Sequence, residues 1–344
     1  MVSLTVTASK AYEVKIGSGL LSGLPEEIRA LGKAEKICLV SDSNVFPLYG
    51  SGCVALLEQA GFLVNTFVFP AGEASKTGET WLKLLNHLAE AQLTRTDLIV
   101  ALGGGVVGDL AGFAAATYLR GIRYVQIPTT VLAAVDSSVG GKTAIDLASG
   151  KNLAGAFYQP SLVLIDTDTL KTLPEDIFQD GCAEVVKYGI LYDPALFAYL
   201  EETGPDFDRE HVIQRCVELK AAVVAQDERD TGPRQKLNLG HSIGHSVEAN
   251  SHFGISHGKA VAIGMAIVSR ASHCPDKDRI LSLLDRFGLP STTEYTADDL
   301  CHYTLSDKKR AGGTVNLILP NAIGDCAIVP TPVEKLKSFI QAGL

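Results

Sequence analysis

Four residues in the second half of the chain are of types whose side chains can bind transition metals. His241 and His245 lie four residues apart, so their imidazoles share one face if this segment is helical. His257 follows further along, and Glu184 lies upstream in a segment with a helical pattern. Two imidazoles and one carboxylate leave an open coordination position, which is the ligand set of a catalytic rather than a structural zinc. These residues predict a zinc with three protein ligands, and their spacing leaves the choice between His241 and His245 open.

Glycine stands beside each of these histidines. A single histidine is more often a packed or surface residue than a metal ligand, and that is the alternative interpretation of each one. Gly240 and Gly244 precede the first two histidines, and Gly258 follows the third. This arrangement suits imidazoles that line a crowded cleft, and it favours the metal site.

A glycine-rich turn provides the chemistry of nucleotide binding. Gly103, Gly105 and Gly108 have GxGxxG spacing after an apolar run, before a helix that we expect to open near Asp109. Glycines let the backbone approach a pyrophosphate, and a helix N-terminus offers N–H donors. The acidic residue usual about 20 residues later is missing, so a turn that only packs a helix on a sheet is the alternative. Asp42, after an earlier strand pattern, is a candidate for the ribose.

A second polar loop, residues 70–80, follows another strand pattern and contains Glu73 and Lys76. Loops at the carboxyl ends of parallel strands are where open α/β sheets bind ligands. A solvated turn is the alternative.

Cations gather in segments that are too apolar to be only a solvated face. Residues 133–157 combine lysines with aspartate, asparagine and glycine, and further lysines and an arginine occur downstream. Taken alone, Lys220 is better interpreted as a residue at the edge of the core. As a set they predict a site for phosphate and carboxylate groups. The residues are Asp136, Lys142, Asp146, Lys151, Asn152, Lys220, Arg234, Asn238, Lys308 and Lys309.

The overall charge narrows the choice of partners. A formal charge of −9 and a pI near 5.4 disfavour nucleic acid and anionic membrane surfaces. An anionic small substrate would also be repelled at long range, so it requires a local cluster of cations. Seven scattered cysteines without a CxxC pair, and no apolar stretch of membrane-spanning length, predict a cytoplasmic protein.

The pattern of apolar residues predicts an α/β first half. Buried strands are expected at 36–42, 65–70, 97–105, 123–130 and 162–168, with helices at 50–62 and 79–93 between the early ones. This alternation implies a parallel, Rossmann-like sheet covered by helices on both faces.

The second half has a different texture, because residues 174–193, 211–230 and 258–273 read as long helices with few strand signals. We therefore expect two domains: residues 1–170 form an α/β domain, and residues 171–344 form an all-α domain. The boundary is expected within 166–174.

These motifs together resemble the 3-dehydroquinate synthase family. The resemblance is carried by "SDSNV", "GEASK", "ALGGGVVGDLAGFAAATYLRGI", "IPTTVLAAVDSSVGGKTAID", "KNLAGAFYQP", "AEVVKYG", "LNLGHSIGH" and "DKK", in the family's order and spacing. It covers nearly the whole chain. It implies an NAD-binding α/β domain, a helical metal- and substrate-binding domain and a homodimer.

The resemblance also assigns roles to residues of this chain. It implies that zinc, with cobalt as the alternative metal, is held by Glu184, His241 and His257. It implies that NAD contacts Asp42, Glu73, Lys76, Gly105, Val106, Val107, Gly108, Asp109, Thr129, Thr130, Lys142, Lys151, Thr169, Leu170, Lys171 and Thr172. It implies that substrate contacts Asp136, Lys142, Asn152, Lys187, Lys220, Arg234, Asn238, His245 and Lys308, with Arg120 supplied by the partner subunit.

The implied activity is a carbon–oxygen lyase reaction of the shikimate pathway, which supplies chorismate for aromatic amino acid biosynthesis. The enzyme converts 3-deoxy-D-arabino-heptulosonate 7-phosphate into 3-dehydroquinate and phosphate, and NAD is oxidised only transiently. The alternatives are another sugar-phosphate cyclase, or a metal-dependent polyol dehydrogenase with net redox. One residue departs from the family pattern: Lys259 stands where an acidic residue is usual, which puts the orientation of His257 in question.

Overall fold

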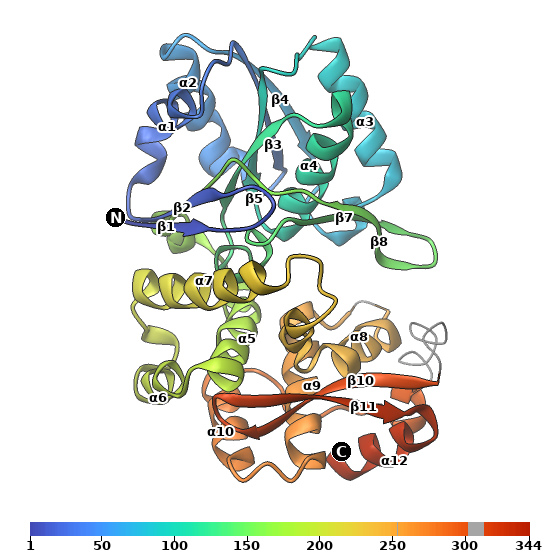
Figure 1. Ribbon diagram of the computed structural model, residues 1–344. Coiled ribbons are helices and arrows are strands. Elements are labelled where there is room, and N and C mark those ends of the chain that lie inside the picture. Colours follow the sequence, from blue (N-terminus) through green and yellow to red (C-terminus); the bar gives the residue numbers. More distant parts are fainter. Residues whose placement is uncertain (253, 302–312) are drawn as a thin grey trace. The chain divides into compact units, whose positions relative to one another are not determined.

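The computed structural model describes residues 1–252, 254–301 and 313–344. The chain divides into two compact units (Figure 1). The first contains Met1–Leu173 and Lys220–Arg229, and the second contains Pro174–Leu219 and Asp230–Leu344. We expected a single division between residues 170 and 171. The sequence did not indicate that Lys220–Arg229 groups with the first unit.

The first unit is built on a seven-stranded sheet within the described residues, with the strand order β1-β2-β9-β6-β5-β3-β4. All neighbouring strands are parallel except β1 and β2, which form an antiparallel hairpin at one edge. The predicted parallel sheet is confirmed, while the edge hairpin was not predicted. The strands are β1 (Val2–Val6), β2 (Tyr12–Gly17), β3 (Lys36–Asp42), β4 (Leu63–Phe69), β5 (Leu98–Gly103), β6 (Arg123–Pro128) and β9 (Leu162–Asp166).

Helices cover both faces of this sheet, as Figure 1 shows. Alternate residues of β3 point to opposite sides: Ile37 and Leu39 pack with α1 (Leu24–Ala30) and α2 (Ser51–Gln59). Cys38 and Val40 pack with α3 (Gly78–Glu90) and α4 (Gly105–Thr117). A central strand buried on both faces must be apolar throughout, which is why its sequence reads as one continuous run.

Helix α4 begins earlier than the sequence predicted. The expected start was near Asp109, but the helix opens at Gly105, and the Gly108 N–H already donates to the Gly104 carbonyl at 3.1 Å. Glycine has a low intrinsic helix propensity, and burial against the sheet overrides it here.

A further hairpin follows β6 in the first unit. Strands β7 (Lys142–Leu147) and β8 (Gly150–Phe157) pair antiparallel, and β7 packs against α4. The sequence indicated polar and cationic groups here but no strands. Short helical turns precede the hairpin and follow β9, at η5 (Ala133–Ser137) and η6 (Thr167–Thr172).

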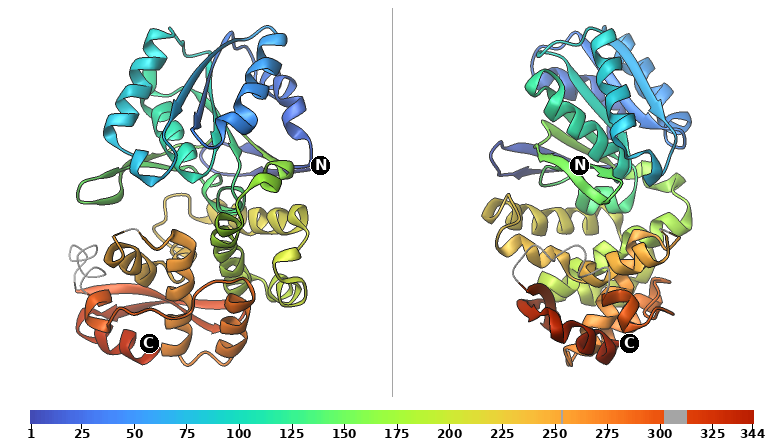
Figure 2. Two further views of the ribbon diagram at one scale, coloured as in Figure 1. Left: turned by 180° about the vertical axis from the view of Figure 1, so that it is seen from behind. Right: turned by 90° about the vertical axis from the view of Figure 1, so that its right-hand side faces the viewer.

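The second unit is mainly helical, as predicted. It is not all-α, however, because it also contains a β-hairpin. Strands β10 (Thr314–Ala322) and β11 (Asp325–Pro332) pair antiparallel and are the red strands near the C-terminus in Figure 2. Gly324, in the turn between them, has a φ of 89°. Helix α9 contacts α5, α8, α10, α12 and β10, and its residues 260–268 are buried throughout. The helices are α5 (Glu175–Tyr192), α6 (Pro194–Thr203), α8 (His241–Asn250), α9 (His257–Ala271), α10 (Lys277–Arg286) and α12 (Val333–Gly343).

Helix α7 (Arg209–Gln226) belongs to both groupings, since its residues from Lys220 onward count with the first unit. Among the described residues, no helix has both the length and the apolar character needed to cross a membrane.

Candidate active site

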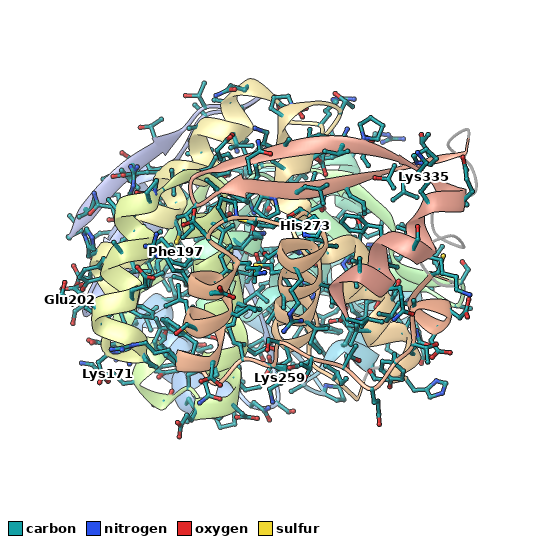
Figure 3. The ribbon with its side chains drawn as sticks, turned by 90° about the horizontal axis from the view of Figure 1, so that it is seen from below. Lys171, Phe197, Glu202, Lys259, His273 and Lys335 are labelled. Carbon is teal, nitrogen blue, oxygen red and sulfur yellow. The ribbon has the colours of Figure 1, made fainter. Side chains whose placement is uncertain are left out.

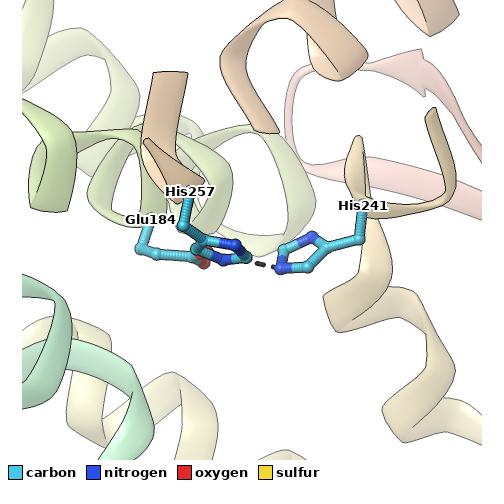
Figure 4. A group of neighbouring side chains, drawn as sticks. All are labelled: Glu184, His241 and His257. Carbon is cyan, nitrogen blue, oxygen red and sulfur yellow. Dashed lines mark ion pairs between the residues drawn. The ribbon is translucent and has the colours of Figure 1, made fainter. Parts of the chain in front are cut away.

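Three side chains of the second unit converge on one point. Glu184 comes from α5, His241 is the first residue of α8, and His257 is the first residue of α9 (Figure 4). Glu184 Oε1 lies 3.4 Å from His241 Nε2 and 3.4 Å from His257 Nε2. Tetrahedral zinc with bonds of about 2.0–2.1 Å separates its ligand atoms by roughly 3.3 Å. Both distances agree with this spacing, and all three ligand atoms lie within 4.8 Å of one another, so the three side chains could hold one ion.

Backbone contacts between the helices bring these residues together. A Cβ on Gly258 would lie 1.8 Å from the Asp180 carbonyl oxygen, so α9 meets α5 at a glycine. A Cβ on Gly244 would lie 2.9 Å from the Ala260 carbonyl oxygen, so α8 meets α9 in the same way. The glycines beside the histidines thus serve close approach of helix backbones. That approach places Glu184 near both imidazoles.

Hydrogen bonds fix the direction of both imidazole rings. The Nδ1 of His241 lies 3.1 Å from the Leu239 carbonyl oxygen, and the Nδ1 of His257 lies 3.3 Å from Glu248 Oε2. Both Nε2 atoms therefore face Glu184. Sequence reasoning missed Glu248, although it lies seven residues after His241 and so falls on the same helical face.

The electrostatics of the cluster favour positive charge between the imidazoles. Burial alone would raise the pKa of Glu184, but Lys187 and the imidazoles hold that pKa well below its usual value. Lys187 is buried and pairs with the Oε2 of Glu184, which leaves Oε1 toward the histidines. Burial lowers the pKa of His241, while for His257 it is outweighed by Glu184 and Glu248, which raise the pKa to about 10.

His245 lies beside the cluster but has a different environment. Its ring centroid is 5.5 Å from that of His241 and 6.0 Å from that of His257, and the residue is exposed. It forms a second possible metal-binding group with Glu248 and His257. Of these two histidines, only His241 belongs to the group that contains Glu184 and His257, as far as the described residues show. The geometry therefore favours His241 over His245 as the ligand.

Lys259 does not take part in orienting His257. Its backbone N–H donates to Asp180 Oδ1 at 3.0 Å, and the residue lines a surface pocket with Asp176, Asp180 and Glu294. Lys259 is labelled in Figure 3. Glu248 supplies the carboxylate that the sequence departure put in question.

We therefore expect Lys259→Met to change zinc affinity by less than about twofold, because a residue behind a metal ligand changes the affinity by 10- to 100-fold only when it contacts that ligand. Competition with a chromophoric chelator measures the affinity. A tenfold loss in this variant would contradict the role given to Glu248.

Two further predicted substrate residues of the second unit lie in η8 (Pro233–Asn238). This turn contacts α5 and contains Asn238 and the buried Arg234. Gly240, with a φ of 78°, then turns the chain into α8 and places His241 at the helix start. Lys308 and Lys309 lie outside the described residues.

In the first unit, Lys76 is the centre of a buried charge cluster. Its Nζ lies 3.0 Å from Glu73 Oε1, 3.3 Å from Asp109 Oδ2 and 3.8 Å from Asp146 Oδ1. Lys151 Nζ lies 3.9 Å from the same oxygen of Glu73. Four residues predicted to bind the nucleotide, from three separate motifs, are thus brought together, and Lys76 at their centre is 4% exposed.

The cluster predicts a pH dependence of stability. Burial raises the pKa of Asp109 to about 6, against the opposing effect of Lys76. Because this pKa exceeds the value of about 3.9 in an unfolded chain, the folded state binds more protons between these values. Stability is therefore lost as the pH rises from about 4 through 6. We expect Asp109→Asn to remove up to about 3 kcal/mol of this pH dependence in urea unfolding, and an unchanged profile would contradict the assignment.

Other predicted nucleotide residues have structural partners or lie apart from Lys76. Asp42 Oδ1 accepts the N–H groups of Asn44 and Val45 at 2.8 and 3.0 Å. The Thr129 N–H donates to Gly103 at 3.0 Å, which joins the end of β6 to the glycine turn. Lys171 pairs with Asp168 at the surface, where its side chain is 73% exposed.

The glycine turn itself is closely packed. A Cβ added at Gly104 would lie 3.1 Å from the Thr130 side chain, and one added at Gly105 would lie 3.2 Å from the Ser137 side chain. Residues 105–109 form the first turn of α4, so Val106, Val107 and Gly108 offer backbone rather than side-chain groups. Thr169, Leu170 and Thr172 lie in η6, where Tyr49 Oη lies 2.6 Å from Thr172 Oγ1.

The predicted substrate residues of the first unit occupy three places. Lys220 pairs with Asp136, and its Nζ also donates to the Asp136 carbonyl at 2.6 Å. The Asn152 N–H donates to Asp146 at 2.8 Å, and Lys142 opens β7. Arg120 is exposed in the turn η4 (Tyr118–Arg120) and has a φ of 65°.

Comparisons with known proteins agree with this arrangement. Residues 66–180 match the model of the 3-dehydroquinate synthase N-terminal domain, and residues 181–310 match that of the C-terminal domain. A 3-dehydroquinate synthase of Pelobacter propionicus is 45% identical, and the alignment covers 98% of each chain.

Two solved structures have the same fold over nearly the whole chain. A 2-deoxy-scyllo-inosose synthase complexed with carbaglucose-6-phosphate, NAD+ and Co2+ has a TM-score of 0.89, 27% identity and full coverage of both chains, each 100%. The 2-epi-5-epi-valiolone synthase of Streptomyces hygroscopicus subsp. jinggangensis, with NAD+ and Zn2+ bound, has a TM-score of 0.87, 28% identity and 98% coverage of both. The chain therefore belongs to the 3-dehydroquinate synthase family.

Proposed function

We propose that this chain is a zinc- and NAD-dependent 3-dehydroquinate synthase, which converts 3-deoxy-D-arabino-heptulosonate 7-phosphate into 3-dehydroquinate and phosphate. The observation that carries the proposal is the convergence of Glu184, His241 and His257 with 3.4 Å between ligand atoms. It is supported by the name of a relative that is 45% identical over almost the full chain. Metal and NAD in the two solved neighbours support the same cofactors.

The residues present fit the metal. Two imidazole nitrogens and one carboxylate oxygen leave a coordination position for a substrate hydroxyl. Bound zinc would lower the pKa of that hydroxyl, and NAD would serve as a reversible hydride acceptor. Lys187 holds one oxygen of Glu184, so the other is directed to the histidines. In the first unit, we propose that the glycine turn and the Lys76 cluster bind NAD.

The anionic groups of the substrate require cations, since the chain carries a formal charge of −9. We propose Arg234 for the substrate carboxylate, because a guanidinium binds carboxylates with two parallel hydrogen bonds and this one is buried on η8. Lys142 and Lys220 in the first unit, and Lys187 in the second, would offset negative charge as phosphate leaves. Asp136, Asn152, Asn238, His245 and Lys308 complete the proposed substrate contacts.

Incubation with the heptulosonate phosphate, NAD and zinc tests the proposal. We expect stoichiometric phosphate release with no lasting absorbance of NADH, because the hydride is returned within each turnover. Accumulating NADH would contradict it and favour a polyol dehydrogenase. Glucose 6-phosphate, a sugar phosphate without a carboxylate, separates the other cyclases: faster phosphate release from it than from the heptulosonate would also contradict the proposal.

We propose that the protein is a homodimer in which Arg120 serves the partner's substrate site. Arg120 is exposed in the turn η4, so its side chain is accessible to a second copy. Light scattering after size exclusion tests the assembly, and a monomer with full activity would contradict it.

A further inference from the structure

The imidazole of His257 is held from both sides by carboxylates. Its Nε2 lies 3.4 Å from Glu184 Oε1, and its Nδ1 lies 3.3 Å from Glu248 Oε2. Glu248 is 2% exposed in the last turn of α8, and His257 opens the neighbouring helix α9. Burying a carboxylate is costly unless it is paired, so this contact accounts for a charged group inside the unit.

His241 has the same arrangement with a neutral partner. Its Nδ1 faces the Leu239 carbonyl at 3.1 Å, and its Nε2 faces Glu184 at 3.4 Å. A carbonyl oxygen accepts but cannot donate, so Nδ1 of His241 must carry the proton. Both rings therefore present Nε2 to the same carboxylate oxygen, one fixed by a neutral acceptor and the other by a charged one.

We propose that Glu248 is a positioning residue for the metal site: it keeps the proton of His257 on Nδ1, directs Nε2 toward the ion and thereby sets the affinity for zinc. This inference rests on the zinc site proposed above. A carboxylate behind a ligating imidazole fixes the tautomer and ring orientation and increases the ligand's basicity. In this role Glu248 acts through His257 and is not itself a ligand.

The same atoms offer a competing role, because His245, Glu248 and His257 form a second possible metal-binding group. A metal there would need the lone pair of His257 Nδ1, which carries the proton when the ring donates to Glu248. His245 is also exposed, whereas Glu184 is buried. The geometry thus favours a single ion at Glu184, with Glu248 behind it.

Zinc affinity and stoichiometry of the full chain test the proposal directly. We would compare wild type with Glu248→Gln, which keeps the size of the side chain and removes its charge, by competition with a chromophoric chelator. We expect one zinc per chain in wild type and a roughly 10- to 100-fold weaker affinity in the variant. The metal-free variant and metal-free wild type should have the same melting temperature. If Glu248 had a purely structural role, the metal-free variant would melt at a lower temperature.

Glu202→Gln is the matched control, since Glu202 is exposed on α6 (Figure 3). It should bind zinc like wild type. Equal zinc affinities of Glu248→Gln and wild type would overturn the proposal. Two zinc ions in wild type and one in Glu248→Gln would overturn it too, because Glu248 would then be a metal ligand. Wild type without any zinc would instead contradict the metal site itself, and Glu184→Gln measured alongside distinguishes these cases.

A measurement on the unaltered protein covers the case in which Glu248→Gln fails to fold. Zinc-loaded wild type with 15N-labelled histidine should show His241 and His257 both protonated at Nδ1 and both metal-bound at Nε2. Metal bound to Nδ1 of His257 would overturn the proposal.

Discussion

Glu184→Gln is expected to remove both bound zinc and turnover. The substitution replaces one of three ligands and the carboxylate that faces both imidazoles at 3.4 Å. Zinc content after dialysis should fall from one per chain to background. Since the metal contributes several kcal/mol to charge stabilisation, and each 1.36 kcal/mol is tenfold, phosphate release should slow by about 1,000-fold or more. Elemental analysis and a phosphate assay measure the two effects.

The same substitution leaves Lys187 buried beside a neutral amide. Breaking a buried ion pair on one side costs about 3–5 kcal/mol, so loss of zinc could be confused with unfolding. The double variant Glu184→Gln with Lys187→Met removes both charges and should regain most of that stability without regaining zinc. Full zinc occupancy in either variant would show that Glu184 is not a ligand.

Gly258→Ala is expected to damage the site without altering any ligand. The added Cβ would lie 1.8 Å from the Asp180 carbonyl oxygen, far inside van der Waals contact. Helices α5 and α9 must then separate, and overpacking of this kind costs about 1–3 kcal/mol. Because His257 is adjacent and Glu184 lies one turn after Asp180, their ligand atoms move apart. A displacement near 1 Å lowers turnover by about 100-fold.

Gly52→Ala is the matched control for this substitution. Gly52 also lies within a helix, α2, but a Cβ there would meet nothing within 4 Å. Alanine should stabilise the protein by up to about 1 kcal/mol and leave zinc binding unchanged. Urea unfolding and chelator competition on both variants measure the difference. If Gly258→Ala retained wild-type stability and zinc affinity, the close approach of α5 and α9 would not be what assembles the site.

The sequence predicted the strands whose two faces are both covered, and it also predicted β4, an edge strand that is mostly exposed or half-buried. Strands β3, β5, β6 and β9 are buried along most of their length and read as continuous apolar runs. The missed strands all belong to hairpins with one open face. Strand β8, for example, has the sequence GKNLAGAF and alternates between exposed and half-buried residues. Its glycines and lysine oppose strand propensity, so only pairing with β7 defines it.

The site was predictable by residue type and not by geometry. The spacing of His241 and His245 suited a shared helical face, but only α5 decides which of them meets Glu184. Glu248 was missed because a glutamate is rarely buried, so its place on the same helical face as His241 did not by itself indicate a partner of His257. Its role depends on α9 crossing α8 at Gly244, which is a tertiary contact that local patterns do not encode.

The grouping of Lys220–Arg229 with the first unit has a consequence for biosynthesis. Lys220 pairs with Asp136, and Glu228 accepts hydrogen bonds from Ser9 and Gln159, so these late residues complete contacts of the early ones. Chains grow from the N-terminus at about 5–20 residues per second. The sheet unit cannot close its contacts when residue 173 leaves the ribosome, and it must wait several seconds while α5 and α6 are made. Nascent-chain folding of the first unit is therefore tied to synthesis of part of the second.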